Sequence, residues 1–202
     1  SPEKFSNRLY NMGLNNKLGL SILGEASPKI PHPKDKDWSG LSLPWMAYGY
    51  GVLLTPLQIL TFYNSVANNG EMVKPVFLSE VNSFSNKTMK MKKVVLNPSI
   101  CSEKTLNKVR VMLENVVNDK GGTAYNIRSK KYKISGKTGT GQVDYNTDNV
   151  QYVSSFVGYF PSDKPKYSCI VVIHRPNKKL GYYGSTVAAP VFKKIADKLY
   201  SL

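Results

Sequence analysis

The residues with the clearest chemical potential lie in one stretch, Lys133-Ile-Ser-Gly-Lys-Thr-Gly-Thr-Gly-Gln-Val-Asp-Tyr145. A lysine between glycine and threonine, as at Lys137, is typical of loops that bind phosphate. That pattern also requires a glycine where Lys131 stands here, and a following helix whose N-terminus faces the phosphate. A polar loop rather than a helix is expected after Thr140. The sequence therefore argues against nucleotide binding.

The same stretch suits a strand that ends beside a binding cleft. On a strand, Lys137 and Gly139 would face one side, and Thr138 and Thr140 the other. Twist or a glycine-induced bulge would bring Lys137 and both threonines towards one site. Gly139 leaves the backbone bare, so an extended peptide could add to the strand edge through main-chain hydrogen bonds. A lysine and two hydroxyl groups at that edge would suit a terminal carboxylate.

The elements that must position this stretch are bounded by residues that typically begin and end helices. Thr55-Pro-Leu-Gln58 reads as a capping box with proline in the first helical position, and Gly70 is expected to end that helix. A second helix is predicted at about 102–119, and Gly121 and Gly122 are expected to end it. Further helices are predicted near the start of the chain, briefly from residue 123, and at about 187–200.

Three strands are predicted close together, at about 132–137, 152–159 and 167–173. The segment Phe160-Pro-Ser-Asp-Lys-Pro165 is a turn with proline near both ends, so the last two strands should form an antiparallel hairpin. Residues 71–81 read as extended, with Pro75 favouring a sheet edge. The predicted class is α+β, an antiparallel sheet of about three strands flanked by helices. Such a small sheet can only just be stable alone, which hints at more sheet outside this chain.

Composition sets broad limits on function. The chain has 202 residues, 41% hydrophobic and 20% charged, which is ordinary for a packed globular protein. Its net charge of +15 would suit a polyanion such as nucleic acid, an anionic membrane surface or an acidic polymer, or only a solvated basic surface. No RNA-binding motif and no zinc spacing is found. The two cysteines, Cys101 and Cys169, form no disulfide framework or metal-ligand pattern.

Several segments resemble one family in the same order along nearly the whole chain. Lys137-Thr138-Gly139 matches one of three short motifs shared by penicillin-binding proteins and class A β-lactamases. The surrounding sequence looks like that of class B penicillin-binding transpeptidases. The segments Leu23–Pro33 and Trp38–Gly51 look most like the septal, cell-division branch. The other matching segments are Ala47–Pro75, Gly121–Ala124, Ser135–Gln142, Ser154–Ile173 and Ala188–Phe192.

The resemblance implies a serine transpeptidase or β-lactamase-like fold and a peptidoglycan D,D-transpeptidase reaction. It implies a catalytic role for Lys137 and an oxyanion-hole role for the backbone N–H of Thr140. Thr138, Gly139, Thr140 and Gly141 would bind the substrate. Neither a cofactor nor a metal is implied. The implied partners are peptidoglycan stem peptides or their lipid-linked precursor, β-lactams and division-complex membrane proteins, with no nucleic acid.

The family's nucleophile is not convincingly present in this sequence. Ser-x-x-Lys occurs only at Ser1–Lys4, which we interpret as a coincidence because the family's serine lies upstream of this region. No convincing Ser-x-Asn motif is found either. Residues 1–202 are therefore expected to be the C-terminal portion of a transpeptidase domain, inactive alone. The complete protein is expected at the periplasmic face of the inner membrane, held by an N-terminal anchor absent from this sequence.

Two alternatives stay open at this point. One is a β-lactamase or β-lactam sensor that shares the Lys137 motif, although the long loop before Trp45 and the capped helix after it speak against the compact β-lactamase layout. The other is a basic module that binds a polyanion, motivated by the net charge of +15.

Overall fold

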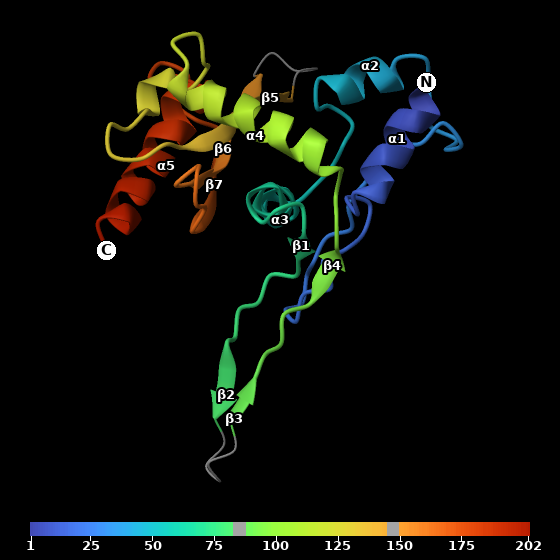
Figure 1. Cartoon of the computed structure of the whole chain (residues 1–202). Coiled ribbons are helices and arrows are strands. Elements are labelled where there is room, and N and C mark those ends of the chain that lie inside the picture. The colour runs from blue at the N-terminus through green and yellow to red at the C-terminus, as the bar shows by residue number, and fades with distance from the viewer. Residues whose placement is uncertain (83–87, 145–149) are drawn as a thin grey trace. The chain divides into compact units, whose positions relative to one another are not determined.

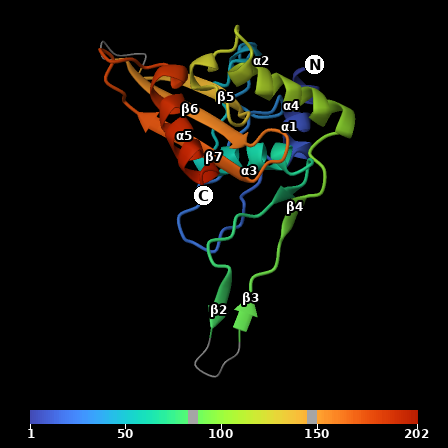
Figure 2. The same ribbon diagram turned by 60° about the vertical axis from the view of Figure 1, so that its left-hand side comes forward.

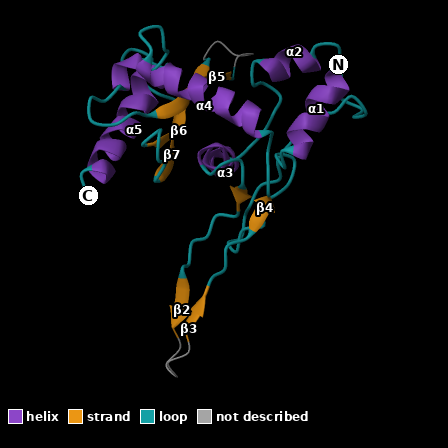
Figure 3. Ribbon diagram, in the orientation of Figure 1, coloured by secondary structure: helices purple, strands orange, loops and turns teal. Residues whose placement is uncertain are grey.

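The computed structural model describes residues 1–82, 88–144 and 150–202 (Figure 1). These residues form two compact units, one of residues 1–65 and 70–101 and the other of residues 66–69 and 102–202. Helices and a three-stranded antiparallel sheet are both present, so the predicted α+β class is confirmed (Figure 3).

The predicted elements occur in the predicted order with some changes of bounds, and α2, β3 and β4 are additional elements that the sequence did not predict. The helices are α1 (Pro2–Asn11), α2 (Ser42–Ala47), α3 (Pro56–Ala67), α4 (Glu103–Asn118), the short 3-10 helix η1 (Tyr125–Ile127) and α5 (Gly184–Tyr200). The strands are β1 (Met72–Val73), β2 (Glu80–Asn82), β3 (Thr88–Lys90), β4 (Val95–Asn97), β5 (Ser135–Val143), β6 (Gln151–Phe160) and β7 (Tyr167–His174).

The first unit packs its long loop around a small apolar core. Leu14, Ile30 and Met46 are buried there, and partly buried aromatic side chains such as that of Trp38 pack against them. The loop is ordered by the Glu25 carboxylate, which accepts hydrogen bonds from two backbone N–H groups, and these hold the pKa of Glu25 below its usual range.

The capping box that begins α3 is confirmed. The N–H of Gln58 donates to Thr55 Oγ1 at 3.2 Å, and the N–H of Thr55 donates to Gln58 Oε1 at 2.8 Å. Gly70 follows the helix with φ of 86°, in the left-handed region that the sequence predicted for it.

A two-stranded ribbon projects from the first unit. Its base is β1 paired with β4, and its outer part is β2 paired with β3, both antiparallel (Figure 2). The predicted extended segment at 71–81 is thus confirmed at its two ends, in β1 and β2, whereas Lys74 to Ser79 between them are not part of a strand.

The sheet of the second unit has the order β5-β6-β7, with both pairings antiparallel. The predicted hairpin of β6 and β7 is confirmed. The first strand was predicted too early, since β5 starts at Ser135 and continues through Gly141 to Val143, where a polar loop was expected. The pairing with β6 runs from Ser135 opposite Tyr159 to Val143 opposite Gln151 without a shift, so of the two alternatives, twist or a bulge, the bulge is wrong. Directly after Lys137 the chain continues as strand to Val143, and not as the helix that a phosphate-binding loop requires.

Helix α5 covers one face of this sheet and holds the main core. Phe156 of β6 meets Phe192 of α5 edge to face, with ring centroids 4.7 Å apart, and both are fully buried. Ala188, Ala189 and Ala196 of α5 are fully buried as well. The helix starts three residues earlier than predicted, at Gly184.

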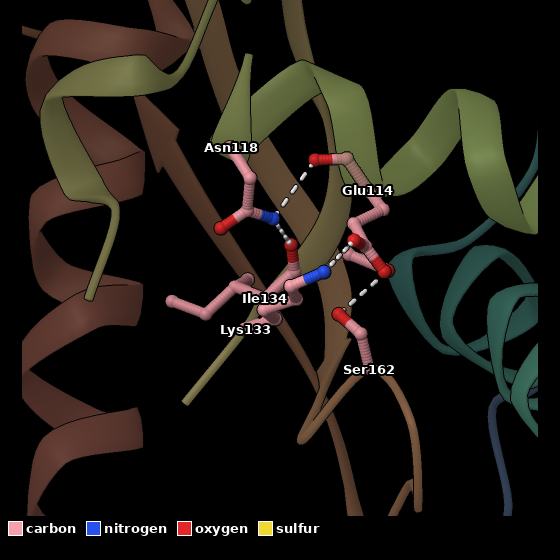
Figure 4. A network of polar contacts seen from close by, with 6 residues as sticks. Glu114, Asn118, Lys133, Ile134 and Ser162 are labelled. Carbon is pink, nitrogen blue, oxygen red and sulfur yellow. Dashed lines mark hydrogen bonds and ion pairs between the residues drawn. The ribbon is translucent and has the colours of Figure 1, made fainter. Parts of the chain in front are cut away.

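Helix α4 is fastened to the start of β5 by polar contacts (Figure 4). Asn118 Nδ2 donates to the carbonyl oxygens of Glu114 and Ile134, each at 2.9 Å, and Lys133 Nζ lies 2.6 Å from Glu114 Oε1. The predicted left-handed glycine stop is wrong, because the helix ends on Asp119 in an extended conformation. Gly122 is required instead by close approach, since a Cβ there would lie 2.3 Å from the carbonyl oxygen of Val116.

The segment before β5 is fastened to α5 through Asp197. The hydroxyl of Tyr132 donates to Asp197 Oδ1 at 2.8 Å, and Lys193 Nζ donates to the same oxygen at 2.6 Å. Partial burial opposes ionisation of Asp197, but the hydrogen bonds from Lys193 and Tyr132 outweigh it and lower the pKa of the carboxyl group. Burial, followed by the Asp197 contact, raises the pKa of Tyr132.

We expect Asp197 to contribute to stability at neutral pH and not in acid. Its folded-state pKa lies below the unfolded value of about 3.9, so the ionised carboxylate favours the folded state above that value. This contribution is lost as pH falls through the folded-state pKa. Urea unfolding between pH 7 and 3 should therefore show Asp197→Asn less stable than wild type at pH 7, with the difference shrinking below about pH 4. The exposed Asp163→Asn serves as the control, and an Asp197→Asn deficit that stays constant with pH would contradict the interpretation.

Candidate active site

The predicted site residues all lie on β5, at the edge of the sheet formed by the described residues. Their alternation is as predicted, because β5 is regular and paired in register with β6. Lys137 and Thr140 are exposed, whereas Thr138, Gly139 and Gly141 are half-buried. The site is thus an accessible strand edge with two exposed polar side chains.

The lysine reaches the threonine side of the strand without any bulge. Lys137 Nζ donates to the carbonyl oxygen of Thr138 at 3.0 Å and lies 3.5 Å from Thr138 Oγ1. Thr138 Oγ1 in turn lies 3.2 Å from Thr123 Oγ1. The flexible side chain of Lys137 therefore makes the approach to Thr138 that the sequence analysis assigned to twist or a bulge of the backbone. Thr123 was not predicted as a site residue, although it belongs to the Gly121–Ala124 segment that carried the resemblance.

Thr140 links the strand to the start of α5. Its Oγ1 accepts a hydrogen bond from the N–H of Gly184 at 3.0 Å. A hydroxyl group has one donor and two acceptor positions, so the Thr140 O–H can still donate to a ligand. The hydroxyl is thus oriented by a helix N-terminus rather than left to rotate freely.

The glycines of β5 serve different purposes. A Cβ at Gly139 would lie 2.5 Å from Ser155 Oγ, so the missing side chain makes room for the neighbouring strand's hydroxyl. A Cβ at Gly141 would meet nothing within 4 Å. The open backbone that the sequence analysis expected at Gly139 therefore lies at Gly141.

An aromatic cluster that the sequence analysis did not predict stands at the same end of the sheet. The rings of Tyr152 and Tyr182 stack with centroids 4.1 Å apart, and the Tyr182 hydroxyl donates to that of Tyr183 at 3.2 Å. This hydrogen bond raises the pKa of Tyr182 to about 12. Tyr152 lies opposite Gln142 of β5, and Tyr183 directly precedes Gly184. The adjacent tyrosines Tyr182 and Tyr183, directly before α5, are the sequence signal that could have indicated this cluster.

The Ser-x-x-Lys match at the start of the chain has a structural role. Ser1 caps α1, and its Oγ accepts a hydrogen bond from the N–H of Lys4 at 3.4 Å. In the ranges 1–82, 88–144 and 150–202, His, Cys, Asp and Glu side chains form no group of three or more that could hold a metal ion. No helix in those ranges is long and apolar enough to cross a membrane.

The family model described as the penicillin-binding protein transpeptidase domain matches residues 1–197. The chain belongs to this family. Among curated relatives, this transpeptidase chain is 32% identical to the peptidoglycan D,D-transpeptidase FtsI of Buchnera aphidicola, over 96% of the chain and 32% of the relative. It is 29% identical to the stage V sporulation protein D of Bacillus subtilis, over 96% of the chain and 30% of the relative. The chain thus spans about a third of the length of these curated relatives.

Solved structures of the family share its fold. Apo penicillin-binding protein 3 of Mycobacterium tuberculosis superposes with a TM-score of 0.82 at 26% identity, over all of this chain and 46% of that one. The transpeptidase domain of Burkholderia pseudomallei penicillin-binding protein 3 gives a TM-score of 0.76 at 28% identity, over all of this chain and 58% of that one. The structure of the first protein has also been solved in complex with aztreonam and with ampicillin. The expected transpeptidase fold is confirmed.

We expect the contact between α5 and the sheet to tolerate no side chain at its start. A Cβ at Gly184 would lie 2.4 Å from the carbonyl oxygen of Ser155 and 2.5 Å from that of Gly139, and backbone atoms cannot rotate away. Gly184→Ala should lower the free energy of unfolding by about 1–3 kcal/mol.

Gly121→Ala is the matched control, since a Cβ there meets nothing within 4 Å and its φ lies outside the left-handed region. Chemical denaturation of both variants measures the difference. Equal stability of the two variants would show that the close approach at Gly184 is not a constraint.

Proposed function

We propose that the chain forms one wall of the acyl-transfer cleft of a peptidoglycan D,D-transpeptidase that acts in cell-wall synthesis and septum formation. In this reaction a serine Oγ attacks the carbonyl carbon of the D-Ala-D-Ala amide of a stem peptide. The terminal D-Ala leaves as a protonated amine, and the acyl group passes to an amine of a neighbouring strand. The observation that carries the proposal is the exposed edge of β5, where Lys137 Nζ lies 3.5 Å from Thr138 Oγ1 and Thr140 follows two residues along the same strand.

Lys137 is the proposed electrostatic and proton-handling group. Its ammonium group is exposed and lies within 3.5 Å of Thr138 Oγ1, next to a hydroxyl chain that reaches Thr123. A cation beside two hydroxyl groups would bind the substrate's terminal carboxylate by charge-assisted hydrogen bonds. The same charge would favour the deprotonated form of a serine nucleophile brought next to it.

The backbone N–H of Thr140 is the proposed oxyanion donor. The carbonyl of Thr138 accepts from Lys137 Nζ, which suits a carbonyl that points away from β6. Backbone groups of residues two apart on a strand point to the same side, so the N–H of Thr140 would share that outer edge. The Thr140–Gly184 hydrogen bond supports its alignment before any ligand arrives. A donor aligned in advance with a developing oxyanion typically lowers the barrier by about 3–4 kcal/mol.

The remaining parts of the reaction are proposed to lie outside these residues. Residues 1–202 would be the C-terminal portion of the transpeptidase domain, and the nucleophilic serine and the Ser-x-Asn residues would come from the part that precedes it. The capping role of Ser1 supports this division, because it gives the Ser1–Lys4 match a purely structural explanation. The complete protein would be anchored at the periplasmic face of the inner membrane, with stem peptides, the lipid-linked precursor, β-lactams and division proteins as partners.

We expect Lys137→Ala in the complete protein to lower the rate constant for acylation by a fluorescent penicillin by about 100-fold or more, since it removes the charge at the proton-transfer site. Stopped-flow labelling measures this rate. Lys164→Ala, at the exposed turn between β6 and β7, is the matched control and should acylate like wild type. Wild-type acylation by a folded Lys137→Ala protein would refute the assignment of Lys137.

A further inference from the structure

The outer part of the ribbon in the first unit exposes an unusual amount of apolar surface. We call residues 76–81 and 89–95 the distal ribbon; every one of them is exposed. Its large apolar side chains are between 42% and 66% exposed. Contiguous exposed apolar surface on a soluble domain usually marks an interaction site. These side chains are Val76, Phe77, Leu78, Val81, Met89, Met91, Val94 and Val95.

The pairing of β2 with β3 sorts the side chains into two faces. Val81 lies directly opposite Met89 in the pairing of β2 with β3, so these two share a face. Met91 follows β3, and its N–H donates to the carbonyl oxygen of Ser79 at 2.9 Å, so the ladder extends to Met91 and places it on the same face as Met89. Glu80 lies opposite Lys90, so the other face carries charged side chains. By the same alternation Lys92, two residues after Lys90, and Leu78, two residues before Glu80, fall on that face. The distal ribbon is therefore amphipathic, with an apolar face and a face that carries lysines.

A ribbon of this kind needs a surface to cover it. Two strands alone are marginally stable in water, and a third strand or an apolar layer is usually required. Both views show β2 and β3 reaching away from the rest of the first unit (Figures 1 and 2), in agreement with the exposure of residues 76–81 and 89–95. Only the base of the ribbon is packed, where Met72 is 3% exposed.

The charge of the distal ribbon indicates what kind of surface would cover it. Lys90, Lys92 and Lys93 outnumber the acidic Glu80 in the distal ribbon, and Lys93 forms an ion pair of 2.5 Å with Glu71 at its base. Like charge disfavours a second copy of the same ribbon as the partner.

We propose that the distal ribbon docks on an anionic phospholipid surface. Val81, Met89 and Met91 would enter the boundary between headgroups and acyl chains, which requires apolar area rather than shape complementarity. Lys90 and Lys92 have long side chains that can bend towards the headgroups, where each contributes attraction to anionic lipid. The polar face would remain in water. This contact is separate from the acyl-transfer proposal and does not depend on it.

The experiment is co-sedimentation of the 202-residue chain with vesicles. Vesicles of phosphatidylethanolamine with 30% phosphatidylglycerol should bind the chain at least about tenfold more strongly than phosphatidylcholine vesicles, and binding should weaken as salt rises from about 0.05 to 0.5 M. The double variant Lys90→Glu/Lys92→Glu and the double variant Val81→Ser/Met89→Ser should each reduce binding at least about tenfold. Unchanged circular dichroism would show that the variants fold.

Matched controls distinguish vesicle binding by the distal ribbon from attraction due to the net charge of the whole chain. Lys120→Glu/Lys164→Glu makes the same change in net charge on the second unit, and Val111→Ser/Met112→Ser removes similarly exposed apolar side chains from α4. Both should bind like wild type. Equal loss in ribbon and control variants would overturn the proposal in favour of non-specific attraction. No binding of wild type to anionic vesicles at low salt would also overturn it and leave an acidic protein as the partner to test.

Discussion

The close approach of Gly184 to the backbone of β5 and β6 is the constraint on which the second unit depends. No side chain fits between the start of α5 and the carbonyl oxygens of Gly139 and Ser155. The same residue donates its N–H to Thr140 Oγ1. Helix α5 also supplies Phe192 to the core against Phe156. The same helix therefore both packs the unit and aligns Thr140 of the candidate site.

The candidate site is therefore held from two sides while its outer edge stays accessible. Helix α4 fastens the start of β5 through Asn118, and the loop after that helix brings Thr123 to Thr138. The start of α5 fastens the other end through Thr140. A rigid strand edge with one bare backbone position and one flexible cation fits a peptide ligand that adds alongside the strand.

Local signals predicted the elements that local interactions determine. The capping box of Thr55 and Gln58 and the proline-flanked turn between β6 and β7 are satisfied within a few residues of sequence, so they could be read directly. The extent of β5 could not, because glycines have low strand propensity and its last residues are held by pairing with β6. The early start of α5 at Gly184 depends on contacts with distant backbone, which no local pattern encodes. Lys137 Nζ approaches Thr138 Oγ1 because its own side chain bends, where the sequence suggested twist or a bulge of the backbone.

The most direct test of the proposed acyl-transfer cleft is a crystal structure of the complete protein acylated by a penicillin. The acyl carbonyl oxygen should lie about 2.7–3.1 Å from the backbone nitrogen of Thr140, the distance expected of an oxyanion donor. The penicillin carboxylate should lie beside Lys137, Thr138 and the Thr140 hydroxyl. A penicillin bound with its carbonyl away from β5, and its carboxylate held by other residues, would contradict the account.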